Sequence, residues 1–414
     1  MTVRIAYVTC DRGVVVGGRN GAATHVRELA SSLVTRGADV VIVTSRADAG
    51  AMGLPIPIVD ADDELLLGEL RRDTARSAEG SAPQASEVHS LLMNTRTTMH
   101  LEALHRTRPF DLVYERQSLW SLAGLAFARR HDLPFFLEVN APLVAQQAEY
   151  RELVNVATAE AISDLLLAHA DRIVVPSRAL ATHLVERGAR AGRVRVVPCG
   201  VSRSLFVARR LPRPSHGPGD PFTVGFVGSL KPWHGVETLL DAFVELRRCS
   251  AAYRLLVVGD GPLRALVEDR CAREHPAGVV MLVGSVPYEH VPDCLARMDV
   301  GLAPYPELPL FYFSPLKVLE YAAAGVPIVA SASGQIAELF VHREHALLHP
   351  PGRVRKIVKH VELLRVNPDL GVRLARRARR VVARTHTWDR LAARVLGMAA
   401  STRRTLGSEP GRHP

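Results

Sequence analysis

The chain has 414 residues, of which 47% are hydrophobic and 23% are charged. This composition is typical of a globular protein with two cores and excludes fibrous and disordered classes. No apolar run approaches the roughly 20 residues of a transmembrane helix, and the N-terminal apolar stretch is too short for a signal peptide. The five cysteines are far apart and lack C-x-x-C spacing. This argues against disulfides and a cysteine zinc site, and predicts a cytoplasmic protein.

The formal net charge of +10 is concentrated near the C-terminus. Residues 353–404 contain 15 lysines and arginines against three acidic residues, a local charge of +12, and the rest of the chain sums to −2. A solvated helix face explains such a pattern, and peripheral contact with the inner face of an anionic membrane is the alternative. Aromatic residues do not interleave with these arginines as in a stacking platform, so we expect no nucleic-acid partner. The sequence makes no prediction about oligomeric state.

Short apolar runs alternate with helical patterns along the chain, beginning with a run at 4–9 and a helix expected at 24–35. We expect strands at 4–9, 40–44, 111–114, 135–139, 172–176 and 194–198, and then at 223–227, 255–258, 279–283, 300–303 and 327–330. Continuous apolar strands separated by helices indicate parallel sheets covered on both faces. The polar stretch 49–90 is expected to be a long mobile or substrate-facing loop with a weak helix near 64–71.

The sequence thus predicts the α/β class, with two Rossmann-like, doubly wound parallel-sheet domains. A segment rich in Pro, Gly and Arg separates them. The expected parts are an N-terminal domain at 1–205, a linker at 206–221, a C-terminal domain at 222–386, and a final helix and tail at 387–414.

A glycine-rich loop, Gly17-Gly18-Arg19-Asn20-Gly21, lies between the first strand and the first helix. Glycines let the backbone approach a ligand there, and the N-terminus of the helix attracts an anion. A plain structural turn is the alternative, because glycine is the usual residue at such corners.

The segment FYFSPLKVLEYAAAGVPIVAS is the strongest element of the second half. Ser314 fits the N-cap of a helix, Pro315 its first position and Gly325 its end. Backbone N–H groups from Ser314 to Lys317 would then point toward a diphosphate. Glu320 lies on the same helical face, where its carboxylate could accept hydrogen bonds from two ribose hydroxyls. The alternative is a surface helix with a Lys317–Glu320 ion pair.

Two other strand–turn–helix corners follow the same plan. The segment GSLKPWHG places Lys231 and His234 in its turn, where cations could neutralise charge on a departing phosphate. The segment VVGDGP places Gly259 and Gly261 where the backbone can make a close approach.

The order of these motifs resembles the GT-B fold glycosyltransferases of the retaining family 4. The segment GGRNGAATHVRELASSLVTRGADVVIVT resembles the opening loop, helix and strand of that family. LVYERQSLWSLAGLAFARRHDLPFFLEVNAPL resembles its acceptor-side segment, and VVPCGVSRSLF resembles the strand that leads into the linker. GSLKPWHG, VVGDGP and SPLKVLEYAAAGVPIVAS follow in the expected order, and HTWDRL resembles the start of a last helix that crosses back to the N-terminal domain. The resemblance covers nearly the whole chain.

Within this resemblance, Glu320 matches the second glutamate of an E-x7-E motif, the one that holds the donor ribose. Tyr312 stands where the first glutamate, which contacts the donor sugar, is expected. The paired Arg and Lys that contact the diphosphate fall on Ser229 and His234, and Lys231 is expected to supply the missing charge.

The resemblance also places a histidine of the N-terminal domain near the reacting centre, but Glu138-Val139-Asn140 holds none, so a different role is expected for Glu138 or Asn140. The predicted catalytic residues are Lys231, His234 and Glu320. The predicted donor-binding residues are Gly17, Gly18, Ser229, Gly259, Val286, Tyr312, Ser314, Pro315, Leu316, Lys317 and Glu320. The predicted acceptor-side residues are His25, Arg116, Glu138 and Asn140.

The activity that the resemblance implies is retaining transfer of a sugar from a nucleotide diphosphate sugar, bound on the C-terminal domain, to a hydroxyl acceptor. The leaving phosphate would take the proton of the acceptor, and neither a metal nor a further cofactor is expected. The acceptor classes are a small polyol, a natural-product aglycone, or a lipid-linked or cell-envelope glycan. The alternatives are a sugar-nucleotide epimerase of the same fold and a glycosyltransferase-like protein that only binds.

Two patterns mimic metal sites. Asp60-Ala61-Asp62 resembles the D-x-D metal site of GT-A glycosyltransferases, but the glycine loops are those of a metal-independent fold. His342 and His345 lie three residues apart without a third ligand, so we expect surface histidines.

Overall fold

The computed structural model describes residues 2–11, 13–48, 51, 53–62, 64–76, 82–150, 152–207 and 220–407. The chain divides into two compact units. The first comprises Met1–Gly18, Ala22–Pro198 and Leu391–Pro414, and the second comprises Arg19–Gly21 and Cys199–Arg390. Most of the predicted linker, residues 208–219, lies outside the described residues. The predicted final helix corresponds to α16 (Trp388–Gly407), whose residues from Leu391 onward belong to the first unit.

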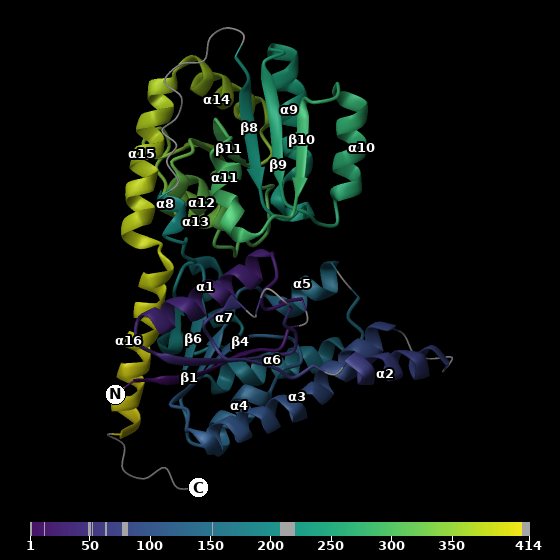
Figure 1. Cartoon of the computed structure of the whole chain (residues 1–414), viewed down its shortest axis with the longest axis vertical. Helices are drawn as coiled ribbons and strands as arrows, with labels where there is room; N and C mark the ends of the chain where they lie inside the picture. The colour runs from purple at the N-terminus through teal and green to yellow at the C-terminus, as the bar shows by residue number, and fades with distance from the viewer. Residues whose placement is uncertain are drawn as a thin grey trace. The chain divides into compact units, whose positions relative to one another are not determined.

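The first unit is built on a parallel sheet that has seven strands among the described residues, in the order β3-β2-β1-β4-β5-β6-β7. The strands are β1 (Arg4–Thr9), β2 (Asp39–Thr44), β3 (Ile58–Asp60), β4 (Leu112–Arg116), β5 (Phe135–Glu138), β6 (Arg172–Val175) and β7 (Val194–Val196). Figure 1 shows α1 (Gly21–Thr35) on one side of this sheet and α3 (Ala82–Thr107) with α4 (Ala123–Arg130) on the other. Because helices cover both faces, the central strands are largely apolar, and the charged residues of β4 and β5 stand at the carboxyl ends of these strands. The other helices are α2 (Glu64–Arg76), α5 (Leu143–Tyr150), α6 (Val156–His169), α7 (Arg178–Glu186) and the short η2 (Ala191–Arg193).

The second unit is built on a parallel sheet with the order β10-β9-β8-β11-β12-β13. The strands are β8 (Phe222–Val227), β9 (Tyr253–Val258), β10 (Val280–Gly284), β11 (Val300–Ala303), β12 (Ile328–Ser331) and β13 (Leu347–His349). Apolar side chains of α9 (Val236–Cys249), α10 (Arg264–Glu274) and α14 (Val354–Val366) form one core cluster with these strands. The other helices are α8 (Ser204–Val207), α11 (Val291–Leu295), α12 (Leu316–Ala324), α13 (Gly334–Leu339), α15 (Pro368–Thr385) and the short η3 (Pro232–His234) and η4 (Tyr288–His290).

The predicted pair of Rossmann-like, doubly wound domains is therefore confirmed. The long loop predicted at 49–90 is wrong over its last part, because α3 begins at Ala82. The buried stripe of α3 recurs every four residues but includes polar side chains, which hid the helical period. The stripe consists of Ala85, His89, Met93, Thr97 and Leu101. Strands β3 and β13, of three residues each, were also not predicted.

No helix in the described part of the chain is both long and apolar enough to span a lipid bilayer. No disulfide joins the five cysteines, all of which lie in described residues.

Both sheets reverse their strand order beside the first strand of the unit. The reversal falls between β1 and β4 in the first sheet and between β8 and β11 in the second. At such a point the loops that leave neighbouring strands diverge, and ligands bind at the carboxyl ends of the strands. The segments that follow β8 and β11, and those that follow β1 and β4, are therefore the places to look for a site, and β5 is the next neighbour of β4.

Candidate functional site

In the second unit, the turn after β8 packs directly against the turn after β9. Gly259 has a φ of 139°, and a Cβ there would lie 2.0 Å from the carbonyl oxygen of Gly228. The Leu230 N–H also donates to the Asp260 carbonyl at 2.9 Å. Gly259, predicted to bind the donor, thus allows the close contact that positions the GSLKPWHG segment at the end of β8. Its role toward a donor stays a prediction.

Helix α12 begins at Leu316, with Pro315 as its N-cap residue. The prediction that Ser314 is the N-cap and Pro315 the first helical residue is therefore wrong by one position. The reason is that the Ser314 hydroxyl has other partners: it accepts the Cys199 N–H at 3.0 Å and donates to Gln335 Oε1 at 2.7 Å.

The first turn of α12 still presents free backbone donors. The Pro315 carbonyl accepts the N–H groups of Val318 and Leu319 at 3.0 and 3.3 Å, whereas the N–H groups of Leu316 and Lys317 precede the first intrahelical acceptor. These donors lie at the positive end of the helix dipole, which attracts anions. Leu316 and Lys317 therefore keep the donor geometry that the sequence predicted for this turn.

The face of α12 that carries the predicted ribose-binding glutamate is buried. Glu320 is 7% exposed and Lys317 is 5% exposed, so the alternative of a surface helix with a solvated ion pair is wrong. Burial raises the pKa of Tyr305, and the nearby Glu320 carboxylate raises that pKa further. Glu320 is thus a buried carboxyl group close to Tyr305, in the segment that follows β11.

The ammonium group of Lys317 is buried without a hydrogen-bond acceptor in any described residue. Nζ lies 3.9 Å from the ring centroid of Phe226 and 5.1 Å from that of Tyr305. Burial lowers the pKa of Lys317 to about 7, although the Glu320 charge acts in the opposite direction. A Cβ placed on Gly228 would lie 3.3 Å from Nζ, so the ammonium adjoins the turn at the end of β8.

The surroundings of His234 favour its neutral form, whereas the sequence predicted a cation at this position of the turn. Burial lowers its pKa well below the usual value, and the charges of Lys317 and Lys231 lower it further. Nδ1 lies 2.6 Å from the Ser229 carbonyl oxygen, so the neutral ring donates its Nδ1 hydrogen to that oxygen. The ring also makes an edge contact with Tyr305 at 5.9 Å between centroids.

Three further residues that the sequence predicted to contact the donor lie in the second unit: Lys231, Tyr312 and Val286. Lys231 places Nζ 5.0 Å from the ring centroid of Trp233. Tyr312 lies on the segment between β11 and α12, with its ring centroid 4.2 Å from that of Phe313. Val286 follows the edge strand β10, which β9 separates from β8. Contacts between these side chains and a donor stay predictions.

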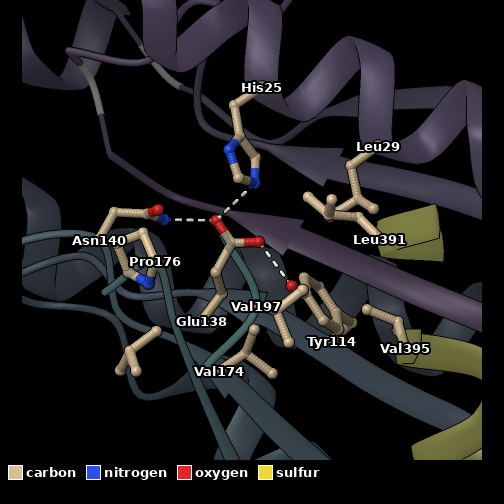
Figure 2. Close-up of a pocket in the computed structure, with 11 residues that line it drawn as sticks. His25, Leu29, Tyr114, Glu138, Asn140, Val174, Pro176, Val197, Leu391 and Val395 are labelled. Carbon is tan, nitrogen blue, oxygen red and sulfur yellow. Dashed lines mark hydrogen bonds and ion pairs between the residues drawn. The ribbon is translucent and has the colours of Figure 1, made fainter. Parts of the chain in front are cut away.

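In the first unit, the structure brings the four predicted acceptor-side residues together: His25, Arg116 and Asn140 surround the carboxylate of Glu138. Figure 2 shows His25 and Asn140 beside this carboxylate. Arg116 Nη1 donates to Glu138 Oε1 at 2.8 Å, and His25 Nε2 lies 3.1 Å from the same oxygen. The Asn140 amide also donates to Oε1, while the Tyr114 hydroxyl donates to Oε2 at 2.6 Å.

The Glu138 carboxylate is an ion in this environment. Burial alone would raise its pKa, but the charges of His25 and Arg116 and the hydrogen bonds from its partners hold the pKa well below the usual range. Burial, and then the negative charge of Glu138, raise the pKa of Tyr114 far above its usual value. The cavity beside this cluster has a volume of about 10 Å³, which is room for about one water molecule. Glu138 therefore orders its neighbours and is not itself open to a sugar.

Sequence reasoning missed Tyr114 as a member of this cluster. Tyr114 and Arg116 are two residues apart on β4, and because successive side chains of a strand point to opposite faces, these two point to the same face of the sheet. Arg116 lies in register with Glu138 on β5. The alternation was visible in the sequence, but the register between the strands was not.

Gly17 and Gly18 lie in the first unit, in the loop between β1 and α1. The Gly18 N–H donates to the Val15 carbonyl at 2.9 Å, which is the hydrogen bond of a structural turn. A contact between this loop and the donor stays a prediction.

The two patterns that mimic metal sites have structural partners. Asp60 accepts the N–H groups of Ala47 and Asp62 at 2.8 and 3.0 Å, and Asp62 lies 3.5 Å from the buried His89. His342 accepts the Leu348 N–H at 2.9 Å. Across the ranges that the structure describes, no group of three histidine, cysteine or acidic residues could hold a metal ion.

Comparison with known proteins gives matches along most of the chain. The family model described as "Glycosyl transferase 4-like domain" matches residues 20–200, and "Glycosyl transferases group 1" matches residues 221–366. The chain is 24% identical over 401 residues to a glycogen synthase of Mycobacterium tuberculosis, covering 94% of this chain and 92% of that protein. It is 26% identical over 427 residues to a D-inositol 3-phosphate glycosyltransferase of Acidothermus cellulolyticus, covering 95% and 89%.

The fold is also similar to that of solved glycosyltransferase structures. HepE of Anabaena, solved in complex with UDP and glucose, aligns with a TM-score of 0.71 and 18% identity over 96% of this chain and 99% of that chain. The two matched family models, the full-length relatives and the two doubly wound sheets agree with one another. The chain therefore belongs to the group 1 glycosyltransferases of family 4 and is a transferase enzyme with the GT-B fold.

Proposed function

We propose that this enzyme transfers a glycosyl group from a nucleotide diphosphate sugar to an acceptor hydroxyl with retention of the anomeric configuration. The observation that carries the proposal is the first turn of α12, which offers unpaired N–H donors beside the buried carboxylate of Glu320. Both lie in the unit whose sheet reverses between β8 and β11.

In this proposal the first turn of α12 binds the diphosphate, because its N–H groups and dipole favour negative charge. Glu320 accepts hydrogen bonds from the ribose hydroxyls, and a charge-assisted pair of this kind is stronger than a neutral one. Tyr312, which replaces a glutamate of the family motif, faces the sugar and contributes to the choice of sugar. The complex of HepE with UDP and glucose supports a nucleotide as part of the donor.

On the acceptor side, we assign to Glu138 a positioning role. Its oxygens are occupied by Tyr114, Arg116 and Asn140, with His25 in ion-pair distance. It therefore holds the guanidinium and amide groups in fixed directions, and these groups bind the acceptor. The names of the relatives, glycogen synthase and D-inositol 3-phosphate glycosyltransferase, support an acceptor rich in hydroxyls.

The chemical step needs no general base from the protein. The bond between the anomeric carbon and the phosphate oxygen breaks, the acceptor oxygen forms a bond to the same face of that carbon, and the departing phosphate oxygen takes the hydroxyl proton. Catalysis is then mostly positional and electrostatic. No metal is required. For the basic stretch 353–404 we retain a solvated helix face, with contact to an anionic membrane surface as the alternative.

Incubation of the purified enzyme with a panel of nucleotide sugars, each with and without polyol acceptors, tests the proposal. We expect a glycoside only when donor and acceptor are both present, and proton NMR of the new anomeric centre should show the configuration of the donor. An epimerised nucleotide sugar without acceptor would favour the epimerase. Binding without any product would favour a protein that only binds, and an inverted product would overturn retention.

A further inference from the structure

The amine of Lys317 is buried without a hydrogen-bond partner among the described residues, and Glu320 is the nearby group whose charge favours its protonated form. Lys317 is 5% exposed. A buried charge is ordinarily paired, because burial without a partner is unfavourable. The faces of Phe226 and Tyr305 offer only a weak attraction to the cation. An ammonium of this kind indicates an anion that the protein binds.

The titratable groups around Lys317 come from three elements. Glu320 and Tyr321 lie on its own helix, Tyr305 follows β11, and His234 and Lys231 belong to the turn after β8. Glu320 is the group whose charge favours the protonated ammonium, and Glu320 has contacts of its own. The other neighbours are neutral aromatic or imidazole groups, or a second cation.

The ammonium lies close to two backbone turns, the first turn of α12 and the turn after β8. Lys317 belongs to the first turn of α12, so one residue contributes both a backbone N–H donor and an ammonium group to this turn. Nζ also adjoins the turn at Gly228. An anion held by the N–H groups of this turn therefore lies within reach of the ammonium.

Two cations that the resembled family carries at this site are replaced in this chain. The positions that carry Arg and Lys in the resembled family hold Ser229 and a neutral His234. Lys231 packs against the ring of Trp233. The second unit thus keeps one buried lysine where two permanent charges are expected.

We propose that the Lys317 ammonium binds the diphosphate of the donor in place of that Arg–Lys pair, and that Lys317 takes up a proton from solvent when the donor binds. This inference rests on the proposed function. In the free enzyme at pH 8 the amine is mostly neutral, since its pKa is about 7. A neighbouring phosphate favours the charged form. Donor affinity is then full below pH 7 and falls as the pH rises through 8.

Isothermal titration calorimetry of the full chain at pH 8, in buffers with different ionisation enthalpies, measures the proton uptake. UDP-glucose and GDP-mannose are suitable probes, because their diphosphates have no ionisation near neutral pH and the proton must come from the protein. We expect uptake approaching one proton in the wild type and none in Lys317→Met or Lys317→Arg. Lys317→Met should bind about tenfold more weakly at pH 6.5, and Lys317→Arg should bind with an affinity that no longer depends on pH.

Matched variants separate Lys317 from other sources. Lys359→Met, at an exposed position of α14, should leave affinity and uptake unchanged, and His234→Gln should keep the uptake. Two outcomes would overturn the assignment to Lys317 but leave the proposed function standing. One is proton uptake that persists when the donor binds Lys317→Met, and the other is donor binding to the wild type without proton uptake. If neither donor bound the wild type, the proposed function and this inference would both fall. Circular dichroism of each variant verifies folding. If Lys317→Met does not fold, the loss of proton uptake is measured with Lys317→Arg instead.

Discussion

Arg116 and Glu138 lie opposite each other in register on the neighbouring parallel strands β4 and β5, and the guanidinium donates to Glu138 Oε1 at 2.8 Å. The side chains of these residues are 13% and 3% exposed. With Tyr114, Asn140 and His25 on the same carboxylate (Figure 2), Glu138 is a fixed anion that organises the end of the first sheet.

The substitution Glu138→Gln should therefore destabilise the first unit. It removes the charge that faces Arg116 and His25, and breaking a buried pair on one side costs about 3 kcal/mol of unfolding free energy. Urea unfolding at pH 7 measures the loss. Because the pKa of Glu138 is lowered in the folded state, this stability is present above pH 4.5 and disappears as the pH falls below it.

The control for this prediction is Glu102→Gln. Glu102 pairs with Arg130 at 3.1 Å and His131 at 2.9 Å, with partially exposed side chains, and such pairs contribute less than about 1 kcal/mol. Similar small losses in both variants would contradict the role of Glu138 as a buried organising anion.

The substitution Glu320→Gln should weaken nucleotide binding. Loss of a charge-assisted pair of hydrogen bonds to ribose costs on the order of 2–3 kcal/mol, which is a decrease in affinity of roughly 30-fold to 150-fold. Titration of the nucleotide measures this effect, and Glu245→Gln, on an exposed pair with Arg248, is the control. Full activity and unchanged nucleotide affinity in Glu320→Gln would reject the assignment.

The substitution Gly259→Ala should destabilise the second unit by about 3 kcal/mol or more. The new Cβ would overlap the Gly228 carbonyl oxygen, and the φ of 139° is unfavourable for alanine. Gly278→Ala is the matched control, since its φ is also positive at 79° but no atom lies within 4 Å of the added Cβ. Backbone strain alone should cost Gly278→Ala about 1 kcal/mol. Equal changes in denaturation midpoint would show that the contact with Gly228 does not matter.

Three histidines should make the second unit less stable in acid. The His360 ring lies 5.5 Å from that of His342 and 6.3 Å from that of His349. Burial, together with the charges of the two other histidines and of nearby basic residues, lowers the pKa of His360 to about 4. The unfolded chain therefore binds more protons below pH 6.5, so stability falls from pH 6.5 toward pH 4.

The size of this effect is on the order of 1–2 kcal/mol, since partial solvent exposure of the ring reduces the full shift. Thermal unfolding between pH 4 and pH 7 should show a shallower slope for His360→Gln than for the wild type. A slope that the substitution does not change would assign the acid sensitivity to other groups.

Chelation should leave the transfer rate nearly unchanged. The carboxylates of Asp60 and Asp62 are engaged by backbone N–H groups and His89, and the proposed step uses the α12 dipole and side-chain cations for charge stabilisation. The rate is measured in the presence of EDTA and after addition of magnesium or manganese. A collapse of the rate that either metal reverses would restore the D-x-D interpretation.

The sequence by itself determined most of the strands and the order of the elements. The central strands each contain a short apolar run, and such runs are local signals of a parallel sheet. The glycine turns and the end of α12 at Gly325 were equally visible, because a positive φ depends on the residue type at one position. The helix α3 escaped because its buried stripe contains His89 and Thr97, whose polarity interrupts the pattern.

The tertiary structure decided what the site residues can do. Ser314 could not be recognised as a partner of Cys199 and Gln335, residues 115 and 21 positions away in sequence. The neutral state of His234 and the unpaired ammonium of Lys317 depend on burial, which neighbouring strands and helices impose. Charge and hydrogen bonding are set by the solvent and the partners that surround a side chain, and only folding brings these together.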